Sequence, residues 1–277
     1  MTRLSPLKSL LLIGFFFIIL TGPFDPKFNL ASQPINDFQN VEKKSAAMWQ
    51  GILPGKAFDF YLIDDFEEKI HWSIQKRSAH EITAKFIEKE PFFLQSKNPV
   101  KREKALMFML DRQYANRSAK ASGRNALKDP KYSYEILFHF QNPGKDLLIL
   151  NLPTANNLKK TIQGIPRAIA LWINNDKPVK HTLYALFSNS NGVFLPVKIS
   201  TLDFNGWQRF EINLPWSLAA KNPKKAHLYD FTFHGLKLKS SSKEQSGFYR
   251  FIIDQIIILV DRSQEHYPGA QIKDSWK

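Results

Sequence analysis

The residues most able to do chemistry form an acidic run directly after the apolar segment 58–63. The run consists of Asp64, Asp65, Glu67 and Glu68. Two facing carboxylates could hydrolyse a glycosidic bond, and carboxylate oxygens are the ligands that calcium prefers. Side chains of a strand alternate between faces, so neighbouring carboxylates point apart, and acids at a strand end are commonly solvated. We therefore predict no catalytic pair and keep Asp64, Asp65 and Asp254 as the calcium candidates.

The remaining chemistry-bearing residue types show no spacing typical of an active site. The seven histidines stand at 71, 80, 139, 181, 227, 234 and 266, without the short spacings of zinc or iron sites. No nucleophile elbow, phosphate-binding loop or dinucleotide fingerprint occurs. The chain has no cysteine, which excludes disulfides, thiolate metal sites and a cysteine nucleophile. The prediction is a protein that is not an enzyme and needs no cofactor.

Short apolar segments separated by polar turns predict the fold. Segments 168–173, 183–187, 193–199 and 207–214 are divided by turns rich in Asn, Asp, Gly and Pro. Segment 132–140 alternates aromatic and polar residues at period two, and the almost wholly apolar segment 248–260 reads as a central strand. This pattern favours an all-β chain folded as a β-sandwich.

Aromatic residues are expected to fill the space between the two sheets. They make up 13% of the chain, with 23 phenylalanines. The predicted structural core contains Phe66, Trp72, Trp172, Trp207, Phe210 and Phe251. For Trp207 a place at the rim is equally open, and an exposed Trp207 and Trp216 on one sheet face would instead indicate a sugar-stacking surface.

The N-terminal segment of the chain suggests export. Arg3 and Lys8 precede the apolar run Leu10–Leu20, which is shorter than the ~20 residues that span a bilayer as a helix. We predict a signal peptide at 1–31, a linker at 32–56, a β-sandwich domain at 57–262 and a tail at 263–277. The predicted location is the periplasm, with no stable membrane span after processing.

The charge is concentrated in two blocks. The chain has 39 basic and 25 acidic residues, a net charge of +14. A basic insertion is predicted at 85–131, with a strand at 104–110 and an irregular loop at 116–130; a second basic block covers 221–243. Nucleic acid is disfavoured as partner because the protein is expected to be exported and its aromatics lie within strands. The blocks are either a solvated face or a docking surface formed by Lys101, Arg102, Lys104, Arg112, Arg117 and Arg124, with a second patch of Lys221, Lys224, Lys225, Lys237 and Lys239.

Several segments together carry a resemblance to a known family: Leu62–Glu67 followed by Trp72, then 134–140, 148–150, 162–172, 181–187 with Asn191-Gly192, 202–215 and 247–256. They resemble the spirochaete flagellar filament outer-layer (sheath) proteins, FlaA. The basic insertion and the turn 174–177 depart from the family pattern, which points to a divergent or associated paralogue. A Gly-Trp-x-x-Phe strand and a final Phe-x-x-Asp-x-Ile strand also resemble jelly-roll carbohydrate-binding modules of the galactose-binding type.

The resemblance implies a structural component of the periplasmic flagellum. Such a protein would bind the flagellin core and other sheath proteins and contribute to filament shape and motility. The alternative is a cell-envelope glycan-binding protein on the same jelly-roll-like sandwich.

Overall fold

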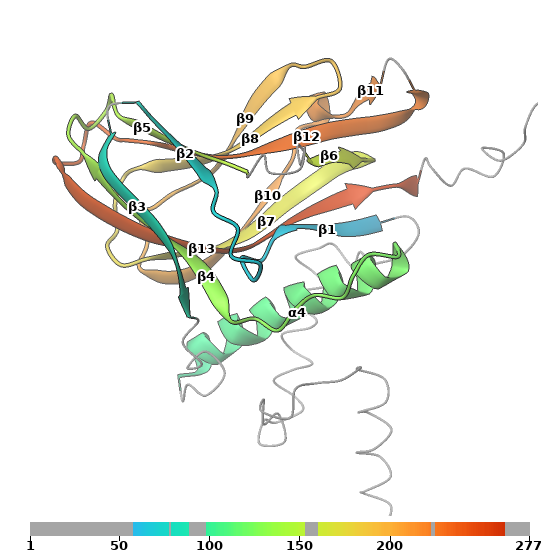
Figure 1. Cartoon of the computed structure of the whole chain (residues 1–277), viewed down its shortest axis with the longest axis horizontal. Helices are drawn as coiled ribbons and strands as arrows, with labels where there is room; N and C mark the ends of the chain where they lie inside the picture. Colours follow the sequence, from blue (N-terminus) through green and yellow to red (C-terminus); the bar gives the residue numbers. More distant parts are fainter. Residues whose placement is uncertain (1–57, 78, 89–97, 153–159, 223–224, 264–277) are drawn as a thin grey trace, which may run out of the picture.

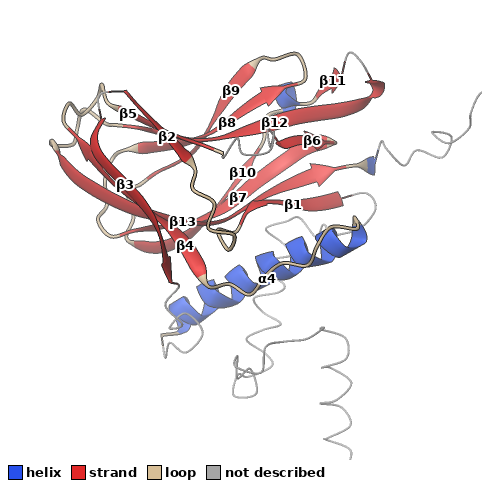
Figure 2. Cartoon of the chain, viewed as in Figure 1, coloured by secondary structure: helices blue, strands red, loops and turns tan. Residues whose placement is uncertain are grey.

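The protein is an antiparallel β-sandwich with one long helix on its outside. The computed structural model describes residues 58–77, 79–88, 98–152, 160–222 and 225–263, and the predicted signal peptide and linker lie outside these ranges. Two sheets lie one above the other in Figure 1, with helix α4 on the side of the lower sheet that faces away from the upper one. Figure 2 shows that strands dominate the architecture.

Sheet A, the lower sheet in Figure 1, has six strands in the order β10-β7-β13-β4-β3, with β1 also paired to β13. Its strands are β1 (Phe58–Asp64), β3 (Ala79–Glu88), β4 (Tyr132–Phe140), β7 (Ile165–Asn175), β10 (Gly206–Asn213) and β13 (Gly247–Asp261). On one side, the first half of β13 pairs with β4 and the second half with β1. The other side of β13 pairs with β7. The predicted central strand at 248–260 is therefore confirmed.

Sheet B has seven strands in the order β2-β5-β12-β8-β9, with β6 and β11 also paired to β12. Its strands are β2 (Ser73–Arg77), β5 (Leu147–Asn151), β6 (Lys160–Gln163), β8 (Thr182–Asn189), β9 (Phe194–Thr201), β11 (Ala220–Asn222) and β12 (Lys225–Lys239). A short 3-10 helix, η2 (Trp216–Leu218), precedes β11. The strand β9 is an edge of the sheet and carries a proline, Pro196.

The main core lies between the sheets because alternate residues of each strand point inward. Sheet B contributes Phe187 and Phe233, and sheet A contributes Phe138 and Phe251, all buried. These side chains belong to one continuous hydrophobic cluster, which fixes the two sheets face to face. The predicted all-β sandwich is therefore what the chain forms.

One predicted segment was assigned to the wrong kind of element. Residues 104–110 are expected as a strand and 116–130 as a loop, but Pro99–Ala121 forms one helix, α4, and the loop begins only after it, over 122–130. Asn98 caps its start: its side-chain oxygen accepts a hydrogen bond from the backbone N–H of Val100 at 2.9 Å. A proline at the first position favours this beginning. The basic insertion is thus largely helical.

A second, smaller core forms where α4 covers part of sheet A. Leu106, Leu110 and Tyr114 of the helix pack on Phe60 of β1 and Leu259 of β13. The rings of Phe60 and Tyr114 stack with centroids 5.2 Å apart. The helix therefore uses its apolar stripe to cover the outer side of sheet A along β1. Within the part of the chain that the structure describes, no helix is long and apolar enough to cross a membrane.

Candidate functional site

The outer surface of sheet B is the candidate functional site. Inward positions of β8 and β12 are filled by buried apolar side chains, so the alternate positions point away from the core. We call the outward residues of three neighbouring strands the open face. They are Tyr184, Leu186 and Ser188 of β8, Phe194, Pro196 and Lys198 of β9, and Thr232, His234 and Lys237 of β12.

One row of the open face places an aromatic ring between two lysines. Lys237 is the register partner of Tyr184 on one side, and Lys198 is its partner on the other. The Nζ of Lys237 lies 5.5 Å from the centroid of the Tyr184 ring. Adjacent strands are about 4.8 Å apart, so the backbones that carry the two lysines lie about 10 Å apart.

A second row contains a stacked aromatic pair. The rings of Phe194 and His234 stack with centroids 4.6 Å apart and an angle of 29° between their planes. His234 Nε2 is 2.8 Å from Ser188 Oγ, which holds the imidazole in place. Phe194 keeps 65% of its surface exposed although it lies in a regular strand. A large apolar ring left open on a rigid strand is a feature typical of a binding surface.

A bulge in β12 lies between these two rows. The pairing of β12 with β8 shifts between Phe233 and Gly235, which leaves His234 outside the regular ladder. Gly235 has φ +145°, and a Cβ added there would be 2.0 Å from the backbone oxygen of Leu150. Only glycine fits this close approach. The bulge therefore sets the position of His234 and places a residue without a side chain between the rows.

The two sheets differ sharply in charge. The strands of sheet B contain eight basic residues (Lys76, Arg77, Lys160, Lys198, Lys221, Lys225, Lys237 and Lys239) and one acidic residue, Asp230. The strands of sheet A contain eight acidic residues (Asp59, Asp64, Glu81, Glu88, Glu135, Glu211, Asp254 and Asp261) and four basic ones (Lys85, Arg167, Arg209 and Arg250). The formal positive charge of the strands is thus carried by sheet B.

The basic side chains of sheet A are used in internal ion pairs. Glu135 contacts Arg250 Nε at 2.5 Å and Lys85 Nζ at 3.0 Å. Burial alone would raise the pKa of Glu135, but hydrogen bonds and charge from these two cations hold the pKa below its usual range. Beside this group, Phe248 is 60% exposed and lies against His139, with ring centroids 4.7 Å apart. This part of sheet A therefore has an exposed aromatic but neutralised charges.

The helix α4 is fastened to sheet A through a buried carboxylate. Arg209 donates to both oxygens of Asp111, and Trp172 Nε1 donates to Asp111 Oδ2 at 3.0 Å. Arg209 also contacts Glu211 at 2.7 Å. Burial alone would lower the pKa of Arg209, but the two carboxylates offset this effect and the pKa is raised. Burial raises the pKa of Glu211.

Three members of the predicted docking surface on the basic insertion have internal partners. Arg112 is buried, contacts Asp65 at 3.3 Å and donates to the backbone oxygen of Lys128, so its assignment to a docking surface is wrong. Arg124 pairs with Asp59 and lies over the ring of Tyr61. Lys104 Nζ donates to the backbone oxygen of Trp207 at 2.6 Å. These three cations hold α4 and its following segment to sheet A.

The other predicted docking residues divide between the helix and sheet B. Lys101 and Arg117 are exposed on α4, and Arg102 is half-buried. In the second block, Lys237 belongs to the open face and Lys239 is exposed at the end of the same strand. Lys221 and Lys225 lie in β11 and β12, and Lys224 lies outside the described residues. The structure therefore brings the two predicted patches to opposite sides of the sandwich.

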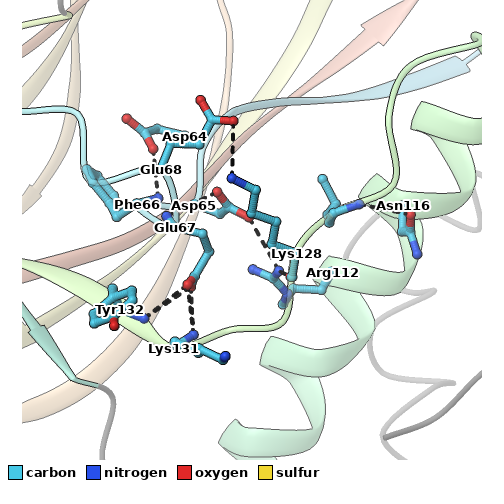
Figure 3. A network of polar contacts seen from close by, with 11 residues as sticks. Asp64, Asp65, Phe66, Glu67, Glu68, Arg112, Asn116, Lys128, Lys131 and Tyr132 are labelled. Atoms are coloured by element: carbon cyan, nitrogen blue, oxygen red, sulfur yellow. Dashed lines mark hydrogen bonds and ion pairs between the residues drawn. The ribbon is translucent and has the colours of Figure 1, made fainter.

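The acidic run Asp64–Glu68 forms a turn whose carboxylates all have partners within the protein (Figure 3). Asp64 accepts hydrogen bonds from the Phe66 backbone N–H and from Trp72 Nε1, both at 2.7 Å. Glu67 accepts from the backbone N–H groups of Lys131 and Tyr132, and Glu68 lies 3.6 Å from Lys128. The turn thereby joins β1 to the segment that follows α4.

The calcium candidates do not gather. Asp65 faces Arg112, and Asp254 Oδ2 accepts a hydrogen bond from Ser133 at 2.7 Å. Among the described residues, no three His, Asp or Glu side chains come close enough to hold a metal ion. The carboxylates that sequence reasoning singled out act in folding and are not metal ligands of one site.

The predicted core residues occupy three different environments. Phe66, Trp72 and Phe251 are buried in the inter-sheet core, and Phe210 packs on it while partly exposed. Trp172 is also buried, but under α4 and against Phe108, with ring centroids 5.6 Å apart. Trp207 is half-buried.

The two tryptophans proposed as a sugar platform are not neighbours. Trp207 lies near the start of β10, and Trp216 follows the end of that strand in η2. Trp216 is 60% exposed and lies beneath Arg167, whose guanidinium carbon is 5.9 Å from the ring centroid. The aromatic residues of the open face are instead the exposed Phe194 and the half-buried Tyr184 and His234, which the sequence analysis does not single out. Each of them alternates with inward-pointing apolar neighbours in its own strand, β8, β9 or β12, and this alternation is the sequence signal for an outward position.

Comparisons with known proteins give structural likenesses only, since no family model and no curated protein matches the chain. The chain is similar to the family 11 carbohydrate-binding module of Clostridium thermocellum in complex with a β-1,3-1,4-mixed-linked tetrasaccharide, with 13% identity, a TM-score of 0.35 and coverage of 72% of this chain and 94% of that one. It is similar to the C-terminal family 22 module of Clostridium thermocellum Xyn10B, with 12% identity, a TM-score of 0.32 and coverage of 76% and 97%. The enzymatically active domain of bacteriophage CBA120 tailspike protein 4 follows, with 11% identity, a TM-score of 0.34 and coverage of 70% and 20%. The function proposed below rests on side chains of this chain alone.

Proposed function

We propose that the protein is a non-catalytic carbohydrate-binding protein whose ligand lies across the open face of sheet B. The observation that carries this proposal is the exposed ring of Phe194, which stacks on the half-buried ring of His234. The C–H side of a sugar ring packs well on such an aromatic surface. Thr232 stands in the same row, and its hydroxyl group can exchange hydrogen bonds with sugar hydroxyls.

The shape of the surface favours an extended ligand. The open face spans three neighbouring strands, and Tyr184 is four residues from Ser188 along β8, a distance of about 13 Å. A polymer that runs along the strands can contact both aromatic groups at once, so several weak contacts add up to useful affinity. The rigid ladder beneath them limits the ordering cost of binding.

The test compares two exposed aromatic sites in affinity electrophoresis. Gels contain mixed-linkage β-glucan, xylan or polygalacturonate, and pull-down on purified peptidoglycan sacculi adds an envelope polymer. We expect Tyr184→Ala with Phe194→Ala to weaken binding at least about tenfold. The matched control, Phe248→Ala, removes an equally exposed ring from sheet A and should leave binding unchanged. Absence of binding by the wild type to every polymer, or equal loss in the control, would refute the proposal.

A second candidate function is a role in the outer layer of the periplasmic flagellum, reached by export. It is supported by the family resemblance and by the exposed cations Lys101, Arg117 and Lys120 on α4. Charge complementarity to an acidic filament surface would orient such a protein. The experiment is to analyse purified filaments from cells with and without the chain, and with Arg117→Glu and Lys120→Glu. Absence of the wild-type protein from filaments excludes this function, and so does retention that the reversed charges leave unchanged.

A further inference from the structure

The lysines of the open face, Lys198 and Lys237, belong to no ion pair among the described residues, although Lys237 lies over the Tyr184 ring. Each basic residue of the sheet A strands belongs to an ion pair. Asp230, the one acidic residue of the sheet B strands, is 9% exposed and pairs in register with β6 and β11. Asp230 and Lys237 are seven residues apart in the same strand, β12.

Two like charges held on one rigid surface repel each other, so the arrangement costs free energy that an external anion can recover. Lys198 and Lys237 flank Tyr184 from neighbouring strands, with their backbones about 10 Å apart. An anionic group over Tyr184 would lie within reach of both ammonium groups, because each lysine side chain is long and flexible. The aromatic ring below offers contact to the ring that carries the anion.

We propose that the ligand of the open face is an acidic polysaccharide whose charges are carboxylates, a polymer of uronic acids. This inference rests on the proposed function and names its substrate class. The row of Lys198, Tyr184 and Lys237 binds a charged sugar, and the pair of Phe194 and His234 binds an uncharged face of a neighbouring sugar. Lysine supplies single point charges and lacks the guanidinium fork suited to bidentate recognition, so the row matches one carboxylate per sugar better than a densely sulfated or phosphorylated chain.

The partner chemistry distinguishes this surface from the exposed helix cations. Among the residues of α4, Lys101, Arg117 and Lys120 are exposed and no aromatic residue is, whereas the open face places Tyr184 between two lysines in one row. An acidic polysaccharide uses both the ring and the charges, because it presents apolar ring faces and spaced charges along one chain.

The experiment uses the full chain and a pair of polymers that differ only in charge. Binding to polygalacturonate and to its fully methyl-esterified form is measured by affinity electrophoresis or titration calorimetry, with a chelator present to remove divalent cations. We expect at least about tenfold tighter binding to the acidic form, with a preference that shrinks as salt is raised. Lys198→Gln with Lys237→Gln should abolish the preference while weak binding to the ester remains.

The matched control removes the same two charges from the helix. Arg117→Gln with Lys120→Gln changes the net charge equally, and both residues are exposed. This variant should keep the full preference for the acidic polymer. If it loses the preference as the lysine variant does, net charge alone accounts for the effect and the assignment to the open face is overturned. Thermal unfolding of each variant shows whether the sandwich is intact.

The remaining outcomes separate the substrate class from the function itself. Equal binding to the acidic and the esterified polymer would overturn the inference and leave carbohydrate binding in place. Tighter binding to dextran sulfate than to polygalacturonate would overturn the assignment of carboxylate as the charged group. Binding to neither these polymers nor the neutral β-glucan and xylan would refute the proposed function as well.

Discussion

Arg209 of β10 reaches across to α4 and holds both oxygens of Asp111. The Nε of Arg209 lies 2.7 Å from Oδ2 of Asp111, and its Nη2 lies 3.0 Å from Oδ1. Both side chains are almost completely buried, at 4% and 2% exposure. Removing one partner of such a pair leaves a buried charge without compensation. This contact therefore adds a buried ion pair to the apolar packing that holds the helix on the sheet.

Asp111→Ala is expected to lower the free energy of unfolding by about 3 to 5 kcal/mol, measured by urea denaturation. The comparison is Asp203→Ala, which breaks the exposed pair of Asp203 with Lys180. Exposed pairs contribute about 0 to 1 kcal/mol, so this variant should unfold near the wild-type midpoint. Equal effects of the two substitutions would show that the buried pair does not hold α4.

Gly235→Ala tests the bulge that sets the open face. The backbone φ of +145° is unfavourable for alanine, and the new Cβ would meet the Leu150 oxygen at 2.0 Å. We expect a loss of at least about 3 kcal/mol or failure to fold. Gly192→Ala also places alanine at positive φ, +78°, but in open space, and should cost only about 1 to 2 kcal/mol. A Gly235→Ala protein as stable as Gly192→Ala would contradict the observed geometry.

His181 makes stability depend on pH. Its ring is buried against Tyr249, with centroids 4.3 Å apart, and its Nδ1 accepts a hydrogen bond from the Ser241 backbone N–H. Burial lowers the pKa of His181 from 6.5 to about 4. Between these two values the unfolded chain binds more protons than the folded chain. Stability is therefore complete above about pH 6.5 and declines as the pH falls toward 4.

The expected size of this effect is on the order of 2 kcal/mol, allowing for partial screening by solvent. Urea midpoints at pH 7 and pH 4.5 should differ more for the wild type than for His181→Gln. Carboxylates with lowered pKa, such as Glu135 and Asp261, titrate in both proteins and cancel in the comparison. Parallel pH profiles for the two proteins would exclude His181 as the source.

Asn98→Ala tests the start of α4. The substitution removes the side-chain oxygen that accepts from the Val100 backbone N–H, so we expect a loss of about 1 kcal/mol in urea denaturation. Asn98→Asp keeps an acceptor and adds a negative charge at the helix N-terminus, which should preserve stability. A loss in the aspartate variant as large as in the alanine variant would show that the cap contributes little.

The strands were predictable because a single period governs their burial. Along 132–140, Tyr134, Ile136, Phe138 and Phe140 are buried and correspond to the alternation visible in the sequence. Turn residues such as Gly192 mark where strands end. These features need no knowledge of which strand pairs with which, so local pattern was sufficient for the sandwich.

The helix α4 is not predicted from the sequence because basic residues stand between the apolar residues that repeat at helical spacing. Leu106, Leu110 and Tyr114 recur every four residues on one face, and Asn98 followed by Pro99 is a typical helix start. The basic residues between them favoured a solvated region, although Arg112 and Lys104 have partners far away in sequence. Pairing across such separations depends on the assembled sheet, which local composition does not reveal.

The candidate site could be predicted only in part for the same reason. Lys237 was included in a basic patch, but its row with Tyr184 and Lys198 depends on the order of β12, β8 and β9. The sequence indicates which positions of each strand point outward. It does not indicate which outward positions of different strands become neighbours. Tryptophans are candidates for sugar binding because of their residue type alone. Phe194 and His234 come together only because their strands pair with β8 on its two sides.

Pro196 has a consequence for how this protein can meet others of its kind. It lies in β9, an edge strand of sheet B, where a bare backbone could recruit a strand from another chain. A proline has no backbone N–H that could donate a hydrogen bond to an added strand. Side-by-side continuation of the sheet into a ribbon of many copies is therefore hindered at this edge.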